Sequence, residues 1–208
     1  EIIIGCMSWG KWGKQFSTKE QIEMIRFCVE NKNTTFDHAD IYGDYQCETL
    51  FGRALALKPS LRDKLQIISK CGILLPSQQR PEISSHRYDQ STGHIIQSVD
   101  QSLKNLNVDS LDMLLIHRPS PLMDPDHVSE AFEHLYTVGK VKHFGVSNFS
   151  AQQFDLLQSR IDMPLLVNQV ELSPLELKHF KDGTLEHAQQ HAVTPMAWSP
   201  FAGGDLFK

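Results

Sequence analysis

The chain has 208 residues, with 20 Lys and Arg against 25 Asp and Glu, which gives a formal net charge of −5. This balance lacks the basic surface that nucleic acids and acidic membranes attract, so we predict neither as a partner. No apolar run reaches the length of a membrane span, and the first residues lack the pattern of a signal peptide. At this length a single domain over residues 1–208 can bury a large core.

The cysteines indicate a reducing compartment. They lie far apart in the sequence and form no C-x-x-C pair; they are Cys6, Cys28, Cys47 and Cys71. Such spacing suits free thiols better than a disulfide framework or a zinc site. We therefore expect a cytoplasmic protein.

Short apolar runs alternate along the chain with longer segments of helical period. Several of the runs are apolar throughout, which is typical of strands that are buried on both faces. The predicted strands are residues 2–6, 34–36, 65–69, 113–116, 143–146, 165–170 and 195–198.

Six helices are predicted between these strands. Ser17 with Glu20 forms a capping box for the first, and Ser150 with Gln153 opens the fifth. The fourth follows Pro125 and ends at Gly139, a residue that suits the left-handed cap. The other three are expected within residues 48–57, 91–108 and 183–191.

Seven strands that alternate with six helices predict β-α-β units and a parallel sheet, either open and doubly wound or closed into a barrel. Polar and ionisable residues follow six of the strands, as in a barrel whose site lies at the carboxyl ends of its strands. An open dinucleotide-binding sheet usually begins with a G-x-G-x-x-G loop, and this chain contains none. We predict an α/β fold, a (β/α)8 TIM barrel that is apparently truncated after the seventh strand.

Four candidate catalytic groups lie at the ends of three successive strands. Asp37 ends one strand and Tyr42 follows it by five residues, Lys70 follows the next strand, and His117 follows the third. A carboxylate, a phenol, an amine and an imidazole at one edge of a sheet indicate proton chemistry.

At these residues the chain resembles the aldo-keto reductase family, and most closely its bacterial NADP(H)-dependent oxidoreductase branch. The resemblance rests on FDHADIYG (residues 36–43), KVKHFGVSNF (140–149) and PMAWSP (195–200), and it extends through almost the whole chain. It implies that Tyr42 donates a proton, that Lys70 and Asp37 tune Tyr42, and that His117 orients a carbonyl group.

The chemistry of these side chains agrees with the implied roles. A free tyrosine has a pKa of about 10 and is a poor acid at neutral pH, and a neighbouring ammonium such as that of Lys70 favours the phenolate. Asp37 would keep Lys70 charged near an apolar cofactor pocket. His117 can donate a hydrogen bond to a carbonyl oxygen on which negative charge develops.

The resemblance also implies a cofactor cradle. In the family, residues that match Ser147, Asn148 and Gln169 hydrogen-bond the nicotinamide carboxamide, and an aromatic residue that matches Trp198 stacks on its ring. Many members carry tyrosine at that position, and tryptophan keeps the flat face. Ser199, with the glycine loop at residues 203–204, can approach the pyrophosphate.

The predicted function is the NADPH-dependent reduction of an aldehyde or ketone to an alcohol, with hydride from the nicotinamide and a proton from Tyr42. NADP(H) is implied by the resemblance alone, and NAD(H) stays open. In the family, the basic residues that bind the adenosine 2′-phosphate lie beyond the seventh strand. The partner is a small-molecule carbonyl compound. The sequence leaves its identity and the oligomeric state open.

The length allows a second function. A complete barrel of this kind takes about 250 residues, so we expect either a fragment of a longer reductase or a truncated form with another role. The alternative function is a non-catalytic nucleotide-sensing or regulatory subunit built on the same barrel, or the chain is an inactive fragment. Intact catalytic residues favour the reductase, and the missing eighth strand favours the alternative.

We predict no metal site. His38, Asp40 and His134 lie in neither an H-x-H nor an H-E-x-x-H pattern.

Two further features concern the substrate side. Trp9 and Trp12 are candidates for lining a substrate pocket, with packing an equal alternative for Trp12. The long polar segment 76–90 is predicted to be either a substrate-side lid or an unstructured excursion.

Overall fold

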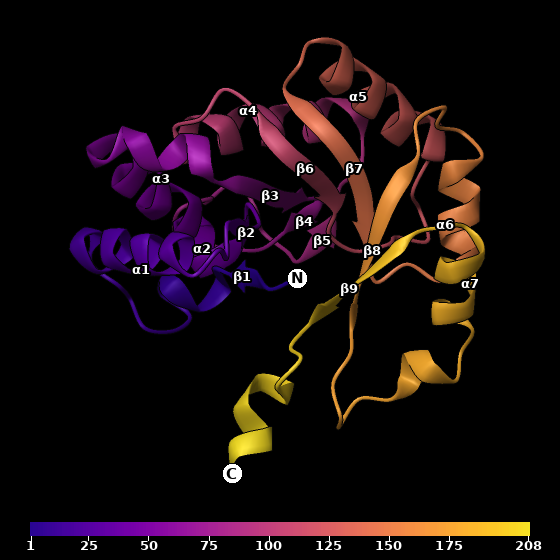
Figure 1. Ribbon diagram of the computed structural model, residues 1–208. Helices are drawn as coiled ribbons and strands as arrows, with labels where there is room; N and C mark the ends of the chain where they lie inside the picture. Colours follow the sequence, from indigo (N-terminus) through magenta and orange to yellow (C-terminus); the bar gives the residue numbers. More distant parts are fainter.

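The computed structural model covers all 208 residues and shows a parallel sheet that curls into an incomplete barrel (Figure 1). Its order follows the chain, every neighbouring pair is parallel, and β1 and β9 form its two edges. The strands are β1 (Ile3–Gly5), β2 (Thr35–Asp37), β3 (Gln66–Cys71), β6 (Leu111–Ile116), β7 (Val141–Ser147), β8 (Leu165–Glu171) and β9 (Thr194–Trp198). All seven predicted strands and the α/β barrel class are thereby confirmed.

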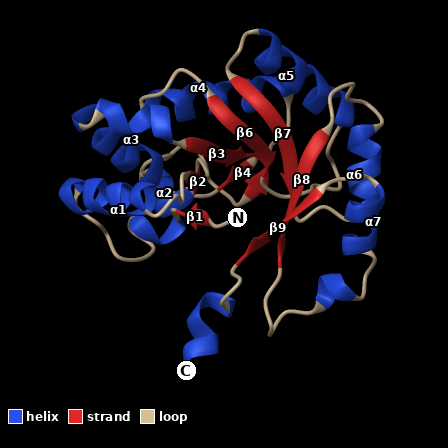
Figure 2. Cartoon of the chain, viewed as in Figure 1, coloured by secondary structure: helices blue, strands red, loops and turns tan.

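Six helices lie on the outer side of the curled sheet (Figure 2). They are α1 (Thr18–Glu30), α3 (Cys47–Leu57), α4 (Thr92–Leu106), α5 (Pro125–Thr137), α6 (Ala151–Gln158) and α7 (Thr184–Gln190). Both halves of the capping boxes are present at Ser17 and Ser150, as the sequence predicts. Gly139, just after α5, has φ +74°, a left-handed conformation that glycine adopts without steric cost.

The connections contain structure that the sequence did not predict. Tyr42–Tyr45 forms a single turn, α2, and the segment after β3 is closed at its base by a ribbon of β4 (Ile73–Leu74) and β5 (Arg87–Tyr88). The segment 76–90 is therefore not an unstructured excursion, because it contains β5 and a bridge between Ser77 and Arg80. Short 3-10 turns are η1 (Met7–Trp9), η2 (Pro59–Lys64), η3 (Lys178–Phe180) and η4 (Ala202–Phe207).

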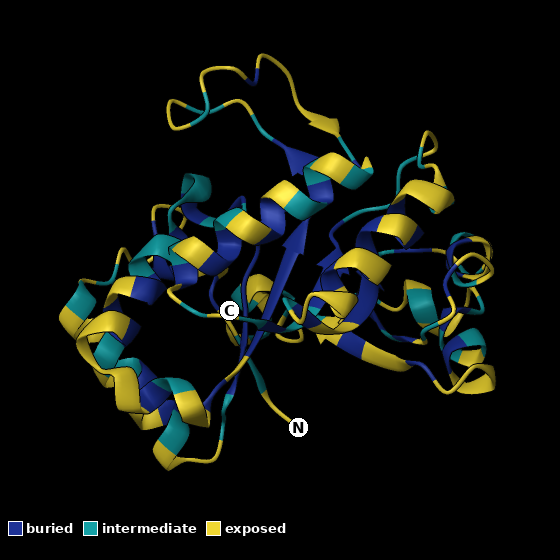
Figure 3. Cartoon of the chain, turned by 90° about the horizontal axis from the view of Figure 1, so that it is seen from above, coloured by how far each residue is buried: buried dark blue, intermediate teal, exposed yellow.

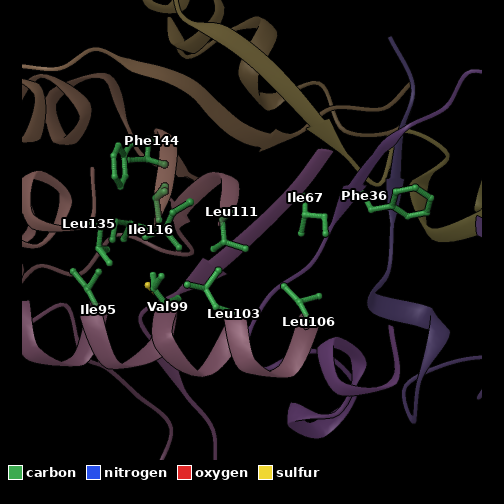
Figure 4. Close-up of a cluster of buried hydrophobic side chains, with 14 of the residues drawn as sticks. Phe36, Ile67, Ile95, Val99, Leu103, Leu106, Leu111, Ile116, Leu135 and Phe144 are labelled. Carbon is green, nitrogen blue, oxygen red and sulfur yellow. The ribbon is translucent and has the colours of Figure 1, made fainter. Parts of the chain in front are cut away.

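The main hydrophobic core lies between the sheet and the helices. Figure 4 shows Ile95, Val99, Leu103 and Leu106 of α4 in a row that faces the strands, as the helical period predicts. Seen from above, the central strands of the sheet are mostly buried and the helices expose their outer faces (Figure 3). This layer of apolar contacts holds the strands at fixed positions relative to one another.

A smaller apolar cluster fills the inner side of the curled sheet. Its buried members are Ile68, Leu115, Val167 and Met196, from four different strands. Gly145 of β7 lies among them, and an added Cβ there would be 2.5 Å from a methyl carbon of Val167. Alternate residues of each strand therefore face the inner cluster, and the residues between them face the helices.

No helix of the structure combines the length and the apolar character that crossing a membrane requires. All four cysteines are free and buried, which confirms the prediction of free thiols.

Replacing Gly145 by alanine tests the inner packing. The new methyl group would also lie 2.8 Å from the Val167 carbonyl oxygen, so neighbouring strands must shift. We expect Gly145→Ala to lower the free energy of unfolding by about 1–3 kcal/mol in urea titrations. The matched control is Gly5→Ala on β1, where an added Cβ has no neighbour within 4 Å. Equal effects of the two substitutions would contradict this account of Gly145.

Candidate active site

The alternation of the strands directs the predicted site residues to the inner side of the sheet. Lys70 comes two residues after Ile68 on β3, and His117 comes two residues after Leu115 on β6. Three more predicted site residues also come two residues after a residue of the inner side. They are Ser147 after Gly145, Gln169 after Val167, and Trp198 after Met196. A period of two thus gathers side chains from five strands at one end of the barrel.

The ammonium group of Lys70 connects the centre of this site. Its Nζ atom lies 2.8 Å from both carboxylate oxygens of Asp37, 2.8 Å from the backbone carbonyl oxygen of His38, and 3.0 Å from Oη of Tyr42. Lys70 is fully buried and Asp37 nearly so. The three N–H donors of the ammonium are therefore occupied entirely by groups from β2 and the turn that follows it.

Burial by itself would lower the pKa of Lys70, because it disfavours the charged form. The charges of Asp37 and Tyr42 and their hydrogen bonds outweigh burial, so the pKa of Lys70 is raised above its usual value. Lys70 therefore carries its charge at neutral pH. This is the relation between Asp37 and Lys70 that the sequence predicts.

Tyr42 is held beside Lys70 by an unusual turn. Gly43, Asp44 and Tyr45 all have left-handed φ values, between 59° and 64°. The hydroxyl of Tyr45 accepts a hydrogen bond from the backbone N–H of Leu75 at 2.7 Å and donates to its carbonyl oxygen at 3.1 Å. The turn is thus attached to the segment after β3, and this attachment fixes the direction of Tyr42.

The electrostatic balance at Tyr42 differs in part from the sequence prediction. Burial raises the pKa of its phenol, the charge and hydrogen bond of Lys70 lower it, and the net result is a pKa above the usual value. Lys70 lowers the pKa of Tyr42, as predicted, but burial raises that pKa by more. Tyr42 is accordingly protonated at neutral pH. Since an ammonium can only donate, Oη accepts from Lys70 and the phenol proton is free to point elsewhere.

His117 faces Tyr42 across the site. The two rings meet edge to face with centroids 5.7 Å apart. Burial, together with the charges of Lys70 and Arg118, holds the pKa of His117 well below its usual range. The imidazole is therefore neutral near pH 7 and carries one N–H donor.

The predicted cofactor residues form a second hydrogen-bonded group beside the first. Asn148 donates from Nδ2 to Oγ of Ser147 at 2.7 Å, and Trp198 donates from Nε1 to Oδ1 of Asn148 at 3.0 Å. Gln169 donates to Asp37 at 3.2 Å and so joins the two groups. Ser199 follows Trp198 and is partly buried, but no hydrogen bond of its side chain links it to these residues. The glycines at 203–204 lie on η4, which extends away from the body of the molecule (Figure 1).

The arrangement fits a nicotinamide ring in its chemistry. A carboxamide needs both donors and acceptors, and the amides of Asn148 and Gln169 and the hydroxyl of Ser147 offer both. The indole of Trp198 offers a flat, partly exposed aromatic face. Arg118, directly after His117, lies over this ring with its guanidinium carbon 5.6 Å from the centroid. Nothing in the sequence indicates this contact except the position of Arg118 just after a strand.

One group that the sequence did not predict supports the site from outside. Glu48 of α3 is buried and accepts hydrogen bonds from Ser69 at 2.7 Å and from Asn105 at 3.3 Å. Burial raises the pKa of this carboxyl group. Ser69 points outward between the inward residues Ile68 and Lys70, so Glu48 fastens the back of the strand that carries Lys70.

The two tryptophans of the first connection have different roles. Trp9 is buried and packs against Phe16, Phe36 and Phe51 with centroids about 6 Å apart. It belongs to the core, so its assignment to a substrate pocket was wrong. Trp12 is 44% exposed and meets Tyr42 edge to face at 6.4 Å, beside the predicted proton donor.

A model of the aldo/keto reductase family matches residues 1–208. The chain belongs to the aldo/keto reductase family. The resemblance that rests on residues 36–43, 140–149 and 195–200 is thereby confirmed.

Bacterial oxidoreductases are among the relatives that the chain matches. The chain is 51% identical over 206 residues to the uncharacterized oxidoreductase YcsN of Bacillus subtilis (strain 168), with 99% of this chain and 68% of the relative covered. It is 45% identical over 183 residues to a 6-dehydroglucose reductase of Agrobacterium fabrum (strain C58), with 88% and 62% covered. The chain thus spans about two thirds of the length of the curated relatives that it matches.

The fold agrees with solved members of the family. A glycerol dehydrogenase of Gluconobacter oxydans superposes with a TM-score of 0.83 at 26% identity, over 97% of this chain and 60% of that chain. The curled seven-stranded sheet therefore corresponds to part of the (β/α)8 barrel of the aldo/keto reductases.

A buried histidine behind the site makes the stability depend on pH. Neither ring nitrogen of His38 has a hydrogen-bond partner, and the ring packs against Phe51 at 4.5 Å between centroids. Burial and the charge of Lys70 lower the pKa of His38 to about 3. The folded form therefore stays neutral while the unfolded chain gains a proton below about pH 6.5, so the stability from neutral His38 is lost as the pH falls.

We expect His38 to account for a loss of about 2 kcal/mol in the free energy of unfolding between about pH 7.5 and about pH 5. His38→Asn lacks this contribution. Urea titrations across that range should therefore show a free energy of unfolding that depends less steeply on pH than in the parent. The matched control is His134→Asn, because His134 is exposed on α5. An equally steep dependence in both variants would show that His38 does not carry the effect.

Proposed function

We propose that this chain carries the catalytic groups and the nicotinamide site of an NADPH-dependent carbonyl reductase, which converts an aldehyde or ketone to an alcohol. The observation that carries the proposal is the buried Lys70 ammonium, bonded at once to both carboxylate oxygens of Asp37 and to Oη of Tyr42. A purely structural ion pair does not need a phenol on the same ammonium. Membership of the aldo/keto reductase family supports the same reaction class.

Tyr42 is the proton donor in this proposal. Reduction of a carbonyl group leaves an alkoxide-like oxygen that must be protonated. The phenol proton of Tyr42 is available because Oη accepts, rather than donates, the hydrogen bond from Lys70 at 3.0 Å. As the proton leaves, the phenolate forms beside the charged ammonium, which stabilises it.

Asp37 and His117 complete the donor site. Asp37 keeps Lys70 charged against the penalty of burial, so the ammonium is in place before the proton moves. Neutral His117 donates its remaining N–H to the carbonyl oxygen and orients it toward Tyr42. Oriented donors of this kind stabilise charge that develops in the transition state.

Ser147, Asn148 and Gln169 would hold the carboxamide of the cofactor, and Trp198 would stack on its ring. Bound there, the reduced nicotinamide supplies the hydride that the carbonyl carbon accepts. The preference for NADP(H) over NAD(H) rests on the family resemblance, and measuring both cofactors tests it directly. Ser199 is proposed to lie along the pyrophosphate.

The substrate is proposed to be a small carbonyl compound that enters beside Trp12. One relative is named a 6-dehydroglucose reductase. A test panel should therefore contain 6-dehydroglucose together with simple aldehydes and diketones. The alternative function, a nucleotide-sensing subunit without turnover, would bind the cofactor in the same site and give no activity with any member of the panel.

Removing the phenol hydroxyl tests Tyr42 as proton donor. We expect Tyr42→Phe to lower kcat by about 10²–10⁴-fold, which is the usual contribution of a general acid. NADPH consumption, followed by absorbance with the carbonyl panel, measures the change in this chain and in any longer natural form that contains it.

The control for Tyr42→Phe is Tyr136→Phe, because Tyr136 is exposed on α5 and outside the site. It should keep the parent rate. Equal rates for Tyr42→Phe and the parent would remove Tyr42 as the donor. Cofactor binding without turnover in the parent would favour the nucleotide-sensing alternative.

Trp198 should contribute to cofactor affinity through its flat face. We expect Trp198→Ala to raise the Kd for NADPH by roughly two- to tenfold, since aromatic stacking is worth ~0.5–1.5 kcal/mol. Trp198→Phe should recover most of the affinity, because it restores an aromatic face for stacking although it lacks the indole N–H. Titration of nicotinamide fluorescence measures all three proteins. Identical affinities in the parent and Trp198→Ala would show that the nicotinamide ring does not stack on Trp198.

A further inference from the structure

A second cluster of ionisable side chains lies on the outer helical layer, separate from the active site. It consists of Asp155 on α6, His187 on α7 and His191, the residue that caps the C-terminus of α7. One ligand atom from each residue lies within 4.8 Å of the other two. The proposed reductase reaction uses none of them.

The two imidazoles approach the same carboxylate oxygen. Nε2 of His187 is 2.7 Å from Oδ1 of Asp155, and Nε2 of His191 is 3.8 Å from the same atom. The first distance is a hydrogen bond, and the second is too long for one. A hydrogen bond to Asp155 therefore accounts for the position of His187, whereas His191 lies within ion-pair range of the same carboxylate without a hydrogen bond to it.

A shared metal ion would explain both positions. Zinc binds imidazole nitrogen and carboxylate oxygen at about 2.0–2.2 Å in a tetrahedral arrangement, which places neighbouring ligand atoms about 3.3 Å apart. The two observed distances lie on either side of this value. The two imidazole nitrogens lie within 4.8 Å of each other, so side-chain rotations can bring the three ligand atoms around one ion.

The backbone and packing of α7 favour this geometry. Histidines four residues apart lie on one face of a helix, and the rings of His187 and His191 are 4.5 Å apart between centroids. The ring of His187 also packs edge to face on Phe154 at 5.4 Å, so one ligand is already oriented. Asp155 and His191 are about half exposed, which leaves the remaining coordination position open to water.

We propose that Asp155, His187 and His191 form a binding site for a divalent transition-metal ion that joins α6 to α7. Two imidazoles and one carboxylate are borderline ligands that suit Zn²⁺ better than Mg²⁺ or Ca²⁺. The prediction of no metal site came from patterns around His38, Asp40 and His134, whereas the sequence signal lies in the H-x-x-x-H spacing of His187 and His191. The carboxylate comes from another helix, so only the fold completes the site.

Isothermal titration of the tag-free chain with Zn²⁺ tests the proposal. We expect saturable binding of one ion per chain, and we expect His191→Ala and Asp155→Asn each to weaken it by more than about tenfold, since loss of even an outer partner of a ligand costs about 10–100-fold in affinity. Zn²⁺ should also raise the Tm of the parent, because it binds only the folded form, and should not raise that of His191→Ala. Both substituted residues are at the surface, so the variants should fold.

The matched control is His179→Ala, which removes a histidine 3.0 Å from the carboxylate of Asp182 in a pair with no third ligand. It should leave zinc affinity unchanged. Replacing Zn²⁺ by Co²⁺ adds a spectroscopic readout, since tetrahedral Co²⁺ absorbs strongly in the visible region. The proposal is overturned if the parent shows no saturable zinc binding, or if His191→Ala and Asp155→Asn bind as tightly as His179→Ala.

Discussion

The candidate active site depends on one buried charge. The ammonium of Lys70 has no contact with water, so its charge is stable only because Asp37, the carbonyl of His38 and Tyr42 surround it. Loss of one partner from such a buried pair costs about 3–5 kcal/mol, since it leaves an uncompensated charge. The segment from β2 to α2 supplies all of these partners, and a single interaction thus fixes the position of Tyr42, the proposed proton donor.

The rest of the barrel keeps that interaction in place from two sides. On the inner side, Leu115, Val167 and neighbouring residues fill the space below the site so closely that Gly145 has no room for a side chain. On the outer side, Glu48 binds Ser69, the residue directly before Lys70. Three successive residues of β3 thus have different surroundings: Ile68 packs in the inner cluster, Ser69 binds Glu48, and Lys70 lies in the candidate site.

Much of the fold follows from local patterns. Apolar runs and capping residues such as Ser17 and Ser150 predict the strands and helices, because strand burial and N-terminal capping are short-range effects. The β4–β5 ribbon was missed because its strands are two residues long and thirteen residues apart at their nearest ends. Trp9 was misplaced because position after a strand does not reveal whether a ring turns toward the core or the pocket.

The sequence by itself determined the family, the order of strands and helices, and the side chains at each strand end, since these depend on residue type and spacing along the chain. Only the tertiary structure decided how they act on one another. It showed that burial outweighs Lys70 in setting the pKa of Tyr42, and that His117 is neutral. It also brought Asp155 of one helix to the histidines of another. Desolvation and contacts between distant segments arise only when the chain is folded, so no local pattern encodes them.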